Sequence, residues 1–593
     1  MSEGRHGSIA AEEEERMRVK LPKKLIICCD GTWMDSDNGW VPGKWGQPGH
    51  LQNPTNVTRL ARAIKSEDDH HHPQIVYYQA GIGTGLGLYN HIVGGGTGLG
   101  LAENVREAYA FLANNYSEHD GLVPNDSIFL AGFSRGAYTA RTLGGFICAM
   151  GVLKKEAMSH FYECFEDWEH AGDPHYKPLF FDNYIRHHKD RQTAVDKVKP
   201  DPKMSRSKDH TIRDKYLDDY FRALLTLGLS QKVTIKAIGV WDTVGALGIP
   251  VNPLLHRILP ILPSFFRTYR FFDTKLHNSI NNAYHALALD ERRFPYSPAI
   301  WERQPECTTN LEQVWFPGAH SNIGGSYADP GIADITLAWM MDRLSGNMLE
   351  DRSKFEYHDW IQFDDNYLDH WYGCLHSWLT DHPDEAVTHG GWARGTLYDS
   401  NTFPQSLAGA RTRSPGKYHG TFYETGNTDF EHVLADTQEH IHSCVRARLD
   451  LGGLAPEPDW SSVFPHGLNL TPLLSHFWRL LRGGKQPLYL PQKRHGPLEE
   501  WVLHDNHAYH DEEHGPNNKI SMESGGLEHI QWHYMGKDVV ARKVLPEARL
   551  GRFELRLLRH DERVAGGMEF SNNGWRWAER FVNPSRHGRT MPV

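Results

Sequence analysis

The sequence predicts an α/β fold in which helices cover both faces of a doubly wound, mostly parallel sheet. Short apolar runs typical of buried strands alternate along the chain with amphipathic segments typical of helices. Such an alternation implies parallel strands, because these need helical crossovers between them. With 593 residues the chain exceeds the usual size of one hydrophobic core, so we expect insertions or a second domain.

The first half of the pattern follows a charged N-terminal tail, residues 1–22, which we expect to be disordered. Residues 25–29 (LIICC) are an apolar run that ends in Asp30, Gly31 and Thr32, as a buried strand followed by a turn does. The next expected elements are a helix at 57–65, a strand at 74–79, a glycine-rich loop at 81–100, a helix at 102–116 and a strand at 127–131.

The second half begins with a charged segment, residues 152–230, that is rich in His, Tyr and Phe and becomes helical toward its end. Because it interrupts the strand series, we expect a helical cap inserted over the sheet. The series then continues with a strand at 233–241, a helix near 276–290, a strand at 313–316 and a helix near 335–344. Beyond about residue 450 periodicity is weak, apart from a possible strand at 552–558 (RFELRLL).

The segment 132–136 (GFSRG) directly follows a predicted strand and precedes a helical pattern. This is the context of a nucleophile elbow, whose glycines allow a tight turn that lifts a serine hydroxyl above the sheet. A serine hydroxyl is a weak nucleophile at neutral pH and needs a neighbouring base. The sequence therefore predicts Ser134 as the nucleophile, with Gly132 and Gly136 shaping the elbow.

The helix after the elbow offers a dipole and free backbone N–H groups to a developing oxyanion. The N–H of Arg135 is the expected first donor. A second donor usually comes from a loop near the start of such a domain, so Gly31 or Thr32, directly after the first strand, is the best-placed candidate. The glycine-rich loop at 81–100 is the alternative.

Asp242 and His320 complete the predicted site. Asp242 ends the strand at 233–241, and carboxyl ends of parallel strands carry functional side chains, although a helix or turn cap is its alternative role. His320 follows the strand at 313–316 in a loop whose glycines could hold an imidazole over the nucleophile. The order nucleophile, acid, base is that of α/β-hydrolases, so we expect a serine hydrolase acting on an acyl ester.

Charge and cysteine content limit the kinds of binding partner and the cellular compartment that we expect for this protein. The net charge of −11 is not concentrated in one block, which disfavours nucleic acid. Seven irregularly spaced cysteines indicate reduced thiols, and neither a signal peptide nor a transmembrane-length apolar run is evident, so we expect a cytoplasmic protein. Residues 250–272 combine apolar with basic residues, and we interpret them as a packed loop or a cap helix. Peripheral contact of this segment with a lipid surface is the alternative.

Other functions fit less well. Segment 28–32 (CCDGT) partly matches the motif of haloacid dehalogenase-like phosphatases, but Cys28 replaces their nucleophilic Asp, and the loop at 81–100 lacks the P-loop Lys-Ser/Thr. No metal or organic cofactor is expected, since a cluster of histidines does not share one helical face: His504, His507, His510 and His514. The main alternative is a catalytically silent scaffold or ligand-binding protein, with protein partners unidentified.

Several segments together resemble one known family. They are 29–33 (CDGTW), 54–57 (PTNV), 81–85 (GIGTG), 103–109 (ENVREAY), 132–141 (GFSRGAYTAR), 240–246 (VWDTVGA), 285–293 (HALALDERR) and 314–325 (VWFPGAHSNIGG), with weaker matches at 414–418 (SPGKY) and 441–446 (IHSCVR). They are similar to an uncharacterised α/β-hydrolase family that includes the catalytic domains of type VI secretion phospholipase effectors. The resemblance implies an α/β-hydrolase-like fold and a lipase or phospholipase site at Ser134, Asp242 and His320.

The resemblance also suggests how the chain is organised. The expected parts are the tail at 1–22, a catalytic domain at 23–345 that includes the cap at 152–230, a family-like continuation at 346–450 and a C-terminal region of unknown function at 451–593. One departure is Asn322, where many members of the family have Asp. The insert at 34–52 and the unmatched C-terminal region suggest a fungal member, with a small-molecule or lipid ester as its substrate.

Overall fold

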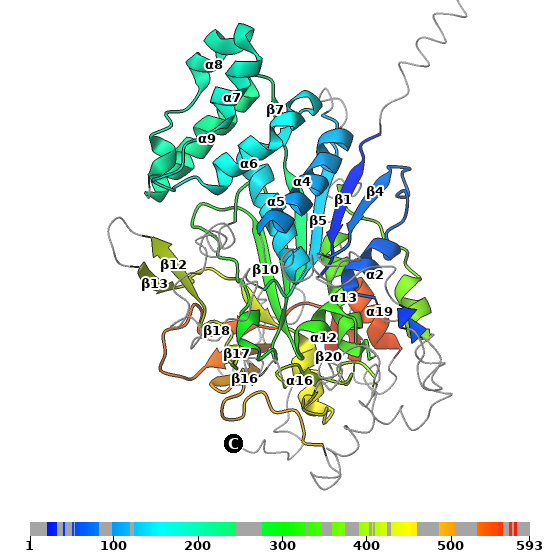
Figure 1. The fold of residues 1–593 in the computed structure, drawn as a ribbon. Helices are drawn as coiled ribbons and strands as arrows, with labels where there is room; N and C mark the ends of the chain where they lie inside the picture. Colours follow the sequence, from blue (N-terminus) through cyan, green and yellow to red (C-terminus); the bar gives the residue numbers. More distant parts are fainter. Residues whose placement is uncertain are drawn as a thin grey trace, which may run out of the picture.

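A seven-stranded parallel sheet forms the centre of the computed structural model (Figure 1). Its order is β14-β10-β9-β8-β5-β1-β4. The strands are β1 (Lys24–Cys29), β4 (Gln74–Gln79), β5 (Ser127–Phe133), β8 (Ile235–Trp241), β9 (Asn282–Ala288), β10 (Asn310–Phe316) and β14 (Glu439–Ile441). The structure describes residues 21–31, 40–41, 50–51, 54–81, 98–118, 124–207, 209–244, 276–327, 329–346, 359–373, 391–402, 406, 409–423, 429–458, 486–505, 530–560, 568–571 and 574–577.

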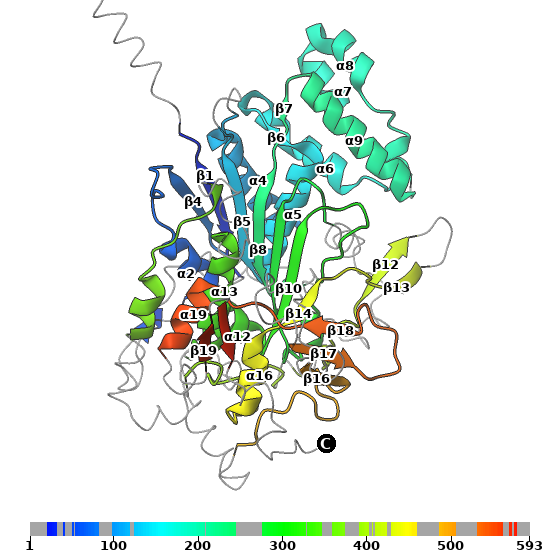
Figure 2. The same ribbon diagram turned by 180° about the vertical axis from the view of Figure 1, so that it is seen from behind.

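Helices cover both faces of the sheet (Figures 1 and 2). Side chains of β1 alternate between the two resulting cores: Ile26 and Cys28 point to one, Leu25 and Ile27 to the other. The first core contains α2 (Asn56–Ala63) and α13 (Gly331–Leu344), and the second contains α4 (Gly98–Asn115) and α5 (Arg135–Met150). The predicted α/β fold with a doubly wound, mostly parallel sheet is confirmed.

The strand order places a switch point at the carboxyl ends of β1 and β5. β1 pairs with β4 on one side and with β5 on the other, so successive crossovers run in opposite directions from it. Open α/β sheets bind ligands at such a point, in the crevice where the strand order reverses. Gly31 follows β1 closely there, and Ser134 follows β5.

The segment at 152–230, which we expected to form a cap, is a helical insertion between α5 and β8. It contains α6 (Phe161–Glu169), α7 (Phe180–His187), α8 (Gln192–Val198) and α9 (His210–Thr226), framed by the pairing of β6 (Val152–Leu153) with β7 (Ser230–Gln231). However, α5 runs back from the carboxyl end of β5 before the insertion starts, so the insertion lies at the amino ends of the strands. Figures 1 and 2 show α7, α8 and α9 at the opposite end of the molecule from α12 (His320–Gly324).

Two predicted elements were wrong. The expected helix near 276–290 is strand β9, which lies between β8 and β10 and is buried along its whole length. An apolar run buried on both faces has no period that separates strand from helix. The possible strand at 552–558 is helix α19 (Arg552–Arg559), whose buried Phe553, Leu557 and Leu558 lie on one helical face.

The C-terminal segments pack against the sheet domain. A small antiparallel sheet of β16 (Trp501–Asp505), β17 (Ile530–Tyr534) and β18 (Val544–Pro546) contributes Trp501, Trp532 and Leu545 to the same core as α13. Arg446 of α16 (Ser443–Asp450) forms two buried hydrogen bonds of 2.9 and 2.8 Å with Glu547. Residues on both sides of position 450 therefore share one core.

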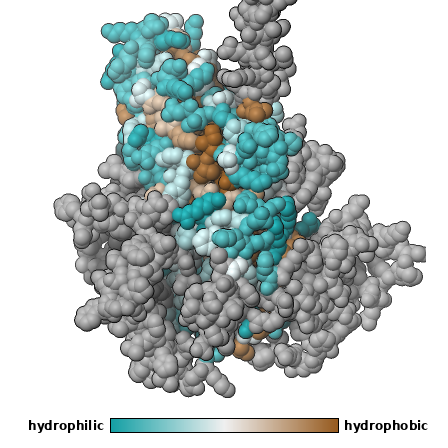
Figure 3. All heavy atoms as spheres, turned by 90° about the vertical axis from the view of Figure 1, so that its right-hand side faces the viewer, coloured by the Kyte–Doolittle hydropathy of each residue, from teal (hydrophilic) through white to brown (hydrophobic). Residues whose placement is uncertain are grey.

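The remaining described elements are short. Besides β6 and β7, the described residues form four further strand pairs outside the main sheet: β2 (Trp40–Val41) with β3 (His50–Leu51), β11 (Tyr398–Asp399) with β15 (Glu457–Pro458), β12 (His419–Tyr423) with β13 (Asp429–Val433), and β19 (Met568–Ser571) with β20 (Gly574–Trp577). On the side drawn in Figure 3, the described surface is mostly hydrophilic. None of the described helices has the length and apolarity that crossing a membrane requires.

Helix α19 begins where a carboxylate from another helix accepts its free N–H groups. The buried carboxylate of Asp342, on α13, accepts the N–H groups of Phe553 at 3.0 Å and Glu554 at 3.1 Å. We expect Asp342→Ala to lower the free energy of unfolding by about 1–2 kcal/mol, the usual cost of a lost N-terminal cap. Urea denaturation measures this. Glu306→Ala, at an exposed side chain, is the control, and equal stability of the two variants would contradict the capping role.

Candidate active site

Ser134 stands on a strained turn between β5 and α5. Its φ of 58° and ψ of −121° lie in a region that non-glycine residues rarely adopt, and its N–H donates to the carbonyl of Trp241 at 3.1 Å. Such strain costs about 1–3 kcal/mol and is typical of functional sites. Within the described helix α5, the Ser134 hydroxyl makes no capping hydrogen bond, so capping does not occupy it.

Glycine is required at both positions that flank the turn. A Cβ at Gly132 would lie 2.5 Å from the carbonyl oxygen of Gly136, and a Cβ at Gly136 would lie 2.2 Å from that of Cys29. Both clashes are with backbone atoms, which cannot rotate away. The close approach of α5 to the end of β1 therefore depends on these two glycines.

The loop after β1 lies directly against the elbow. A Cβ built at Gly31 would be 3.5 Å from the Cβ of Ser134. However, the N–H of Gly31 already donates to Oδ1 of Asp30 at 2.6 Å, so this group is engaged and poorly suited to receive an oxyanion. Thr32 lies outside the described residues. Arg135 is the first residue of α5, so its backbone N–H lies at the positive end of the helix dipole.

Asp30 anchors the start of the loop that follows β1. Its Oδ2 accepts hydroxyl hydrogen bonds from Thr55 at 2.7 Å, Thr58 at 3.0 Å and Tyr78 at 2.6 Å. Burial raises the pKa of Asp30, while these hydroxyl donors and the N–H of Gly31 act in the opposite direction. The sequence identified Asp30 only as part of a turn; its anchoring role depends on side chains from α2 and β4.

Asp242 and His320 are in direct contact. Oδ2 of Asp242 lies 2.6 Å from Nδ1 of His320, and both residues are buried. The backbone of β9 holds the aspartate, because the N–H of Asp242 donates to Ala286 at 2.7 Å and Oδ1 accepts the N–H of Ala288 at 3.0 Å. Asp242 and His320 thus follow β8 and β10, on either side of β9, the strand that the sequence analysis expected to be a helix.

The imidazole of His320 packs close to the elbow. Its ring centroid lies 4.6 Å from that of Phe133, the residue before Ser134, and 5.0 Å from that of Tyr296. Its backbone N–H donates to Oε2 of Glu291 at 3.2 Å. Burial lowers the pKa of His320, and the contact with Asp242 opposes this without cancelling it. A lowered pKa favours the neutral form of the imidazole.

Asn322 supports the turn that carries His320. Its Oδ1 accepts the N–H groups of Ala319 and Tyr398, each at 3.1 Å, and its Nδ2 donates to the carbonyl of Thr396 at 2.8 Å. An amide supplies both the acceptor and the donor that these contacts need. The residue thus fixes the start of α12 through neutral hydrogen bonds.

Sequence reasoning missed the charged residues around this pair. Arg413 contacts the Asp242 carboxylate, and Arg293 contacts Glu291 through Nε at 3.0 Å and Nη2 at 2.9 Å. Burial would raise the pKa of Glu291, but Arg293 outweighs it and lowers the pKa to about 2. Arg413 directly precedes the family-like segment 414–418, and Glu291 and Arg293 lie within the family-like segment 285–293. The resemblance thus pointed to both segments, but it did not show which of their charged residues meet at the site.

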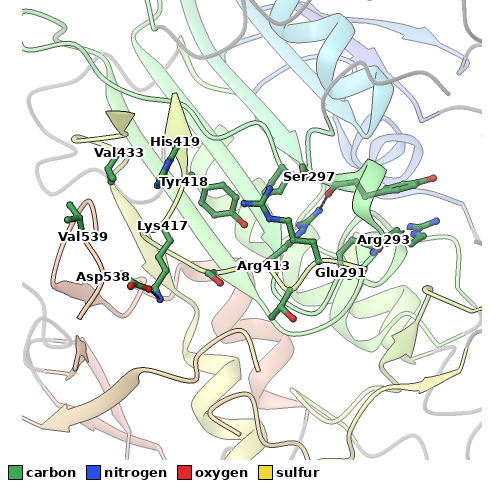
Figure 4. Close-up of a pocket in the computed structure, with 15 residues that line it drawn as sticks. Glu291, Arg293, Ser297, Arg413, Lys417, Tyr418, His419, Val433, Asp538 and Val539 are labelled. Atoms are coloured by element: carbon green, nitrogen blue, oxygen red, sulfur yellow. Dashed lines mark hydrogen bonds and ion pairs between the residues drawn. The ribbon is translucent and has the colours of Figure 1, made fainter. Parts of the chain in front are cut away.

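A cavity of about 560 Å³ opens on the Arg413 side of the site (Figure 4). Its lining includes Glu291, Tyr296, Arg413, Lys417 and Val539, whereas Ser134 is not part of it. Among the described residues, no three His, Cys, Asp or Glu side chains are grouped as metal ligands. His504 packs against His533 with ring centroids 4.5 Å apart, and the other three histidines of the sequence cluster lie outside the described residues: His507, His510 and His514.

Comparison with known proteins agrees with the sequence resemblance. A family model described as "T6SS, Phospholipase effector Tle1-like, catalytic domain" matches residues 23–343. An uncharacterized protein of Saccharomyces cerevisiae, YEL023C, is 24% identical over 413 residues, which cover 54% of this chain and 56% of that protein. The chain thus spans little more than half of this relative. The yeast source of the relative supports the predicted fungal membership.

Two solved structures are also similar. One is the Tle1 effector bound to the VgrG spike of a type VI secretion system, at 19% identity, 52% coverage of each chain and a TM-score of 0.25. The other is an uncharacterized protein from Pseudomonas aeruginosa, at 14% identity, 56% and 47% coverage and a TM-score of 0.26. At TM-scores this low, neither structure bears on the function of this chain.

The elbow makes a packing prediction. Gly136→Ala forces a Cβ against the backbone of Cys29, so we expect it to lower the free energy of unfolding by about 1–3 kcal/mol. Gly145→Ala is the matched control, because it lies on the same helix and its Cβ would first meet a Trp168 side-chain atom at 3.3 Å. Thermal and urea unfolding compare the two. A Gly136→Ala protein as stable as the Gly145→Ala protein would contradict the close approach.

Proposed function

This chain belongs to the family of Tle1-like phospholipase effector catalytic domains, and from that premise we propose that it is a serine hydrolase that cleaves a carboxylic ester, with a lipid or phospholipid as substrate. The observation that carries the proposal is the 2.6 Å contact between Asp242 and the buried His320, beside a strained serine turn. A scaffold would have no reason to retain this strain, which costs free energy.

In the proposed mechanism, Ser134 attacks the ester carbonyl while Nε2 of His320 accepts its proton. Asp242 accepts the hydrogen bond from Nδ1, which fixes the tautomer and stabilises the imidazolium that forms. The backbone N–H of Arg135 stabilises the oxyanion together with a second donor, for which Thr32 is the candidate because the N–H of Gly31 is engaged.

The tetrahedral intermediate collapses when the imidazolium donates its proton to the leaving alcohol, and Ser134 is left acylated. The acyl-enzyme then breaks down in a second step, in which the neutral imidazole removes a proton from water. Water attacks the acyl carbonyl, and the proton returns to Ser134 as the acid leaves. The match to phospholipase effector domains favours a phospholipid over a neutral ester as the substrate.

Removing the proposed nucleophile tests this function. We expect Ser134→Ala to lower the turnover of p-nitrophenyl esters by about three orders of magnitude or more and to abolish labelling by a fluorophosphonate probe. Ser127→Ala, at the opposite end of the same strand, should retain both. Vesicles of mixed phospholipids compared with short esters then identify the substrate class. Labelling of neither the wild type nor Ser127→Ala would favour a catalytically silent scaffold.

The buried imidazole predicts the pH dependence of the reaction. A general base acts in its neutral form, and burial lowers the pKa of His320 below its ordinary 6.5, so the neutral form persists at lower pH. At pH 6.5, kcat/KM should therefore still exceed half of its plateau value. A profile of kcat/KM from mildly acidic to mildly alkaline pH measures this. Half-maximal activity well above neutrality would mean that a different group limits the rate.

A further inference from the structure

Arg413 contacts the same carboxylate that His320 contacts. Its Nη1 donates to Oδ1 of Asp242 at 2.5 Å, and its Nη2 donates to Oδ2 at 3.1 Å. Oδ2 of Asp242 therefore contacts both the guanidinium of Arg413 and the imidazole of His320. Asp242 has no exposed surface and Arg413 is 4% exposed, so water does not screen the ion pair.

The rest of the guanidinium is bonded to the backbone around the site. Nη1 also donates to the carbonyl of Ala288 at 2.7 Å, at the end of β9, and Nη2 donates to that of Tyr296 at 2.6 Å. Tyr296 ends the 3-10 turn Phe294–Tyr296, and its ring packs edge-on against His320. Arg413 thus connects the aspartate, the strand that holds it and the turn that touches the imidazole.

We infer that Arg413 is a positioning residue of the proposed hydrolase: it fixes the orientation of the ionised Asp242 carboxylate and moderates the attraction of that carboxylate for the imidazole of His320. The inference rests on the proposed function. Its geometric basis is the planar fork of the guanidinium, which holds both carboxylate oxygens at once, as a lysine ammonium cannot. Arg413 lies outside residues 23–343, which the family model matches.

A second pair of opposite charges lies beside His320. Arg293 pairs with Glu291 and stacks on Tyr296, with Cζ 3.5 Å from the ring centroid. The neighbouring titratable groups of the packed elements are Arg135 and Arg141 on α5, His285 on β9, Glu291, Arg293 and Tyr296 after β9, and Tyr418 beside Arg413. His285 accepts the N–H of Thr243 at 3.1 Å, and burial lowers its pKa to about 3, so it stays neutral.

The sign of the effect follows from this arrangement. Burial would raise the pKa of Asp242, but Arg413 and His320 together hold it well below its usual value. With a neutral residue at position 413, no guanidinium charge would offset the carboxylate of Asp242, and the carboxylate would stabilise the protonated form of His320 more strongly. The pKa of His320 would then rise, and the acid limb of the pH profile would move to higher pH. A residue that only filled space would not move that limb.

The test compares the wild type with Arg413→Gln and Arg413→Lys on a short soluble ester, recording kcat, KM and the pH midpoint of kcat/KM. We expect Arg413→Gln to lower plateau kcat about 10- to 100-fold, with KM little changed, and to raise the midpoint by about one pH unit. Arg413→Lys retains the charge but not the fork, so it should keep the midpoint near that of the wild type while plateau kcat falls.

Three controls make the outcomes decisive. Arg303→Gln removes a different Arg–Asp pair, with Asp436, and should leave the profile unchanged. If Arg413→Gln folds and keeps the wild-type midpoint, the inference is overturned. If it does not fold, Arg413→Lys decides, because unchanged kcat in that variant would overturn the inference as well. Ser134→Ala distinguishes failure of the proposed function from failure of the inference about Arg413. Full activity of Ser134→Ala would refute the proposed serine hydrolase, whatever the Arg413 variants do.

Discussion

A buried carboxylate is costly unless its neighbours supply charge and hydrogen bonds, and the Asp242 carboxylate sets this requirement for the region around it. Oδ1 receives an N–H from Ala288 and one arm of Arg413, and Oδ2 receives His320 and the other arm. These partners come from β9, α12 and the segment around residue 413. The sheet must therefore be assembled through β10, and the later chain must fold back onto it, before the carboxylate is satisfied.

The serine turn depends on a different constraint: backbone segments approach each other closely there because glycines have no side chain. Gly136 allows the start of α5 to contact the end of β1, and Gly31 lies against Ser134 from the other side. Asp30 then ties the end of β1 to α2 and β4 through three hydroxyl groups. The serine turn thus depends on steric fit at the switch point. The Asp242–His320 pair, after β8 and on α12, depends on paired charges and hydrogen bonds.

Sequence patterns predicted the parts of this structure that depend on local signals. The strands at β1, β4, β5, β8 and β10 followed from apolar runs, and the elbow from its glycines. What failed depends on tertiary context. β9 is buried on both faces and has no diagnostic period, and α19 begins at a carboxylate supplied by α13. The contact of Arg413 with Asp242 spans 171 positions, beyond the reach of any local pattern.

The position of the helical insertion changes which segments can select a substrate. Because the insertion follows the C-terminal end of α5, it lies at the amino ends of the strands, whereas Ser134 and Asp242 lie at their carboxyl ends. The cavity beside Asp242 is instead lined by residues at 291–298 after β9, by residues at 411–414 and 417–419, and by Val433, Asp538 and Val539. Lys417 ties two of these segments together through Asp538 at 2.9 Å. The chain beyond residue 410 therefore supplies Arg413, which pairs with Asp242, and most of the residues that line the cavity beside it.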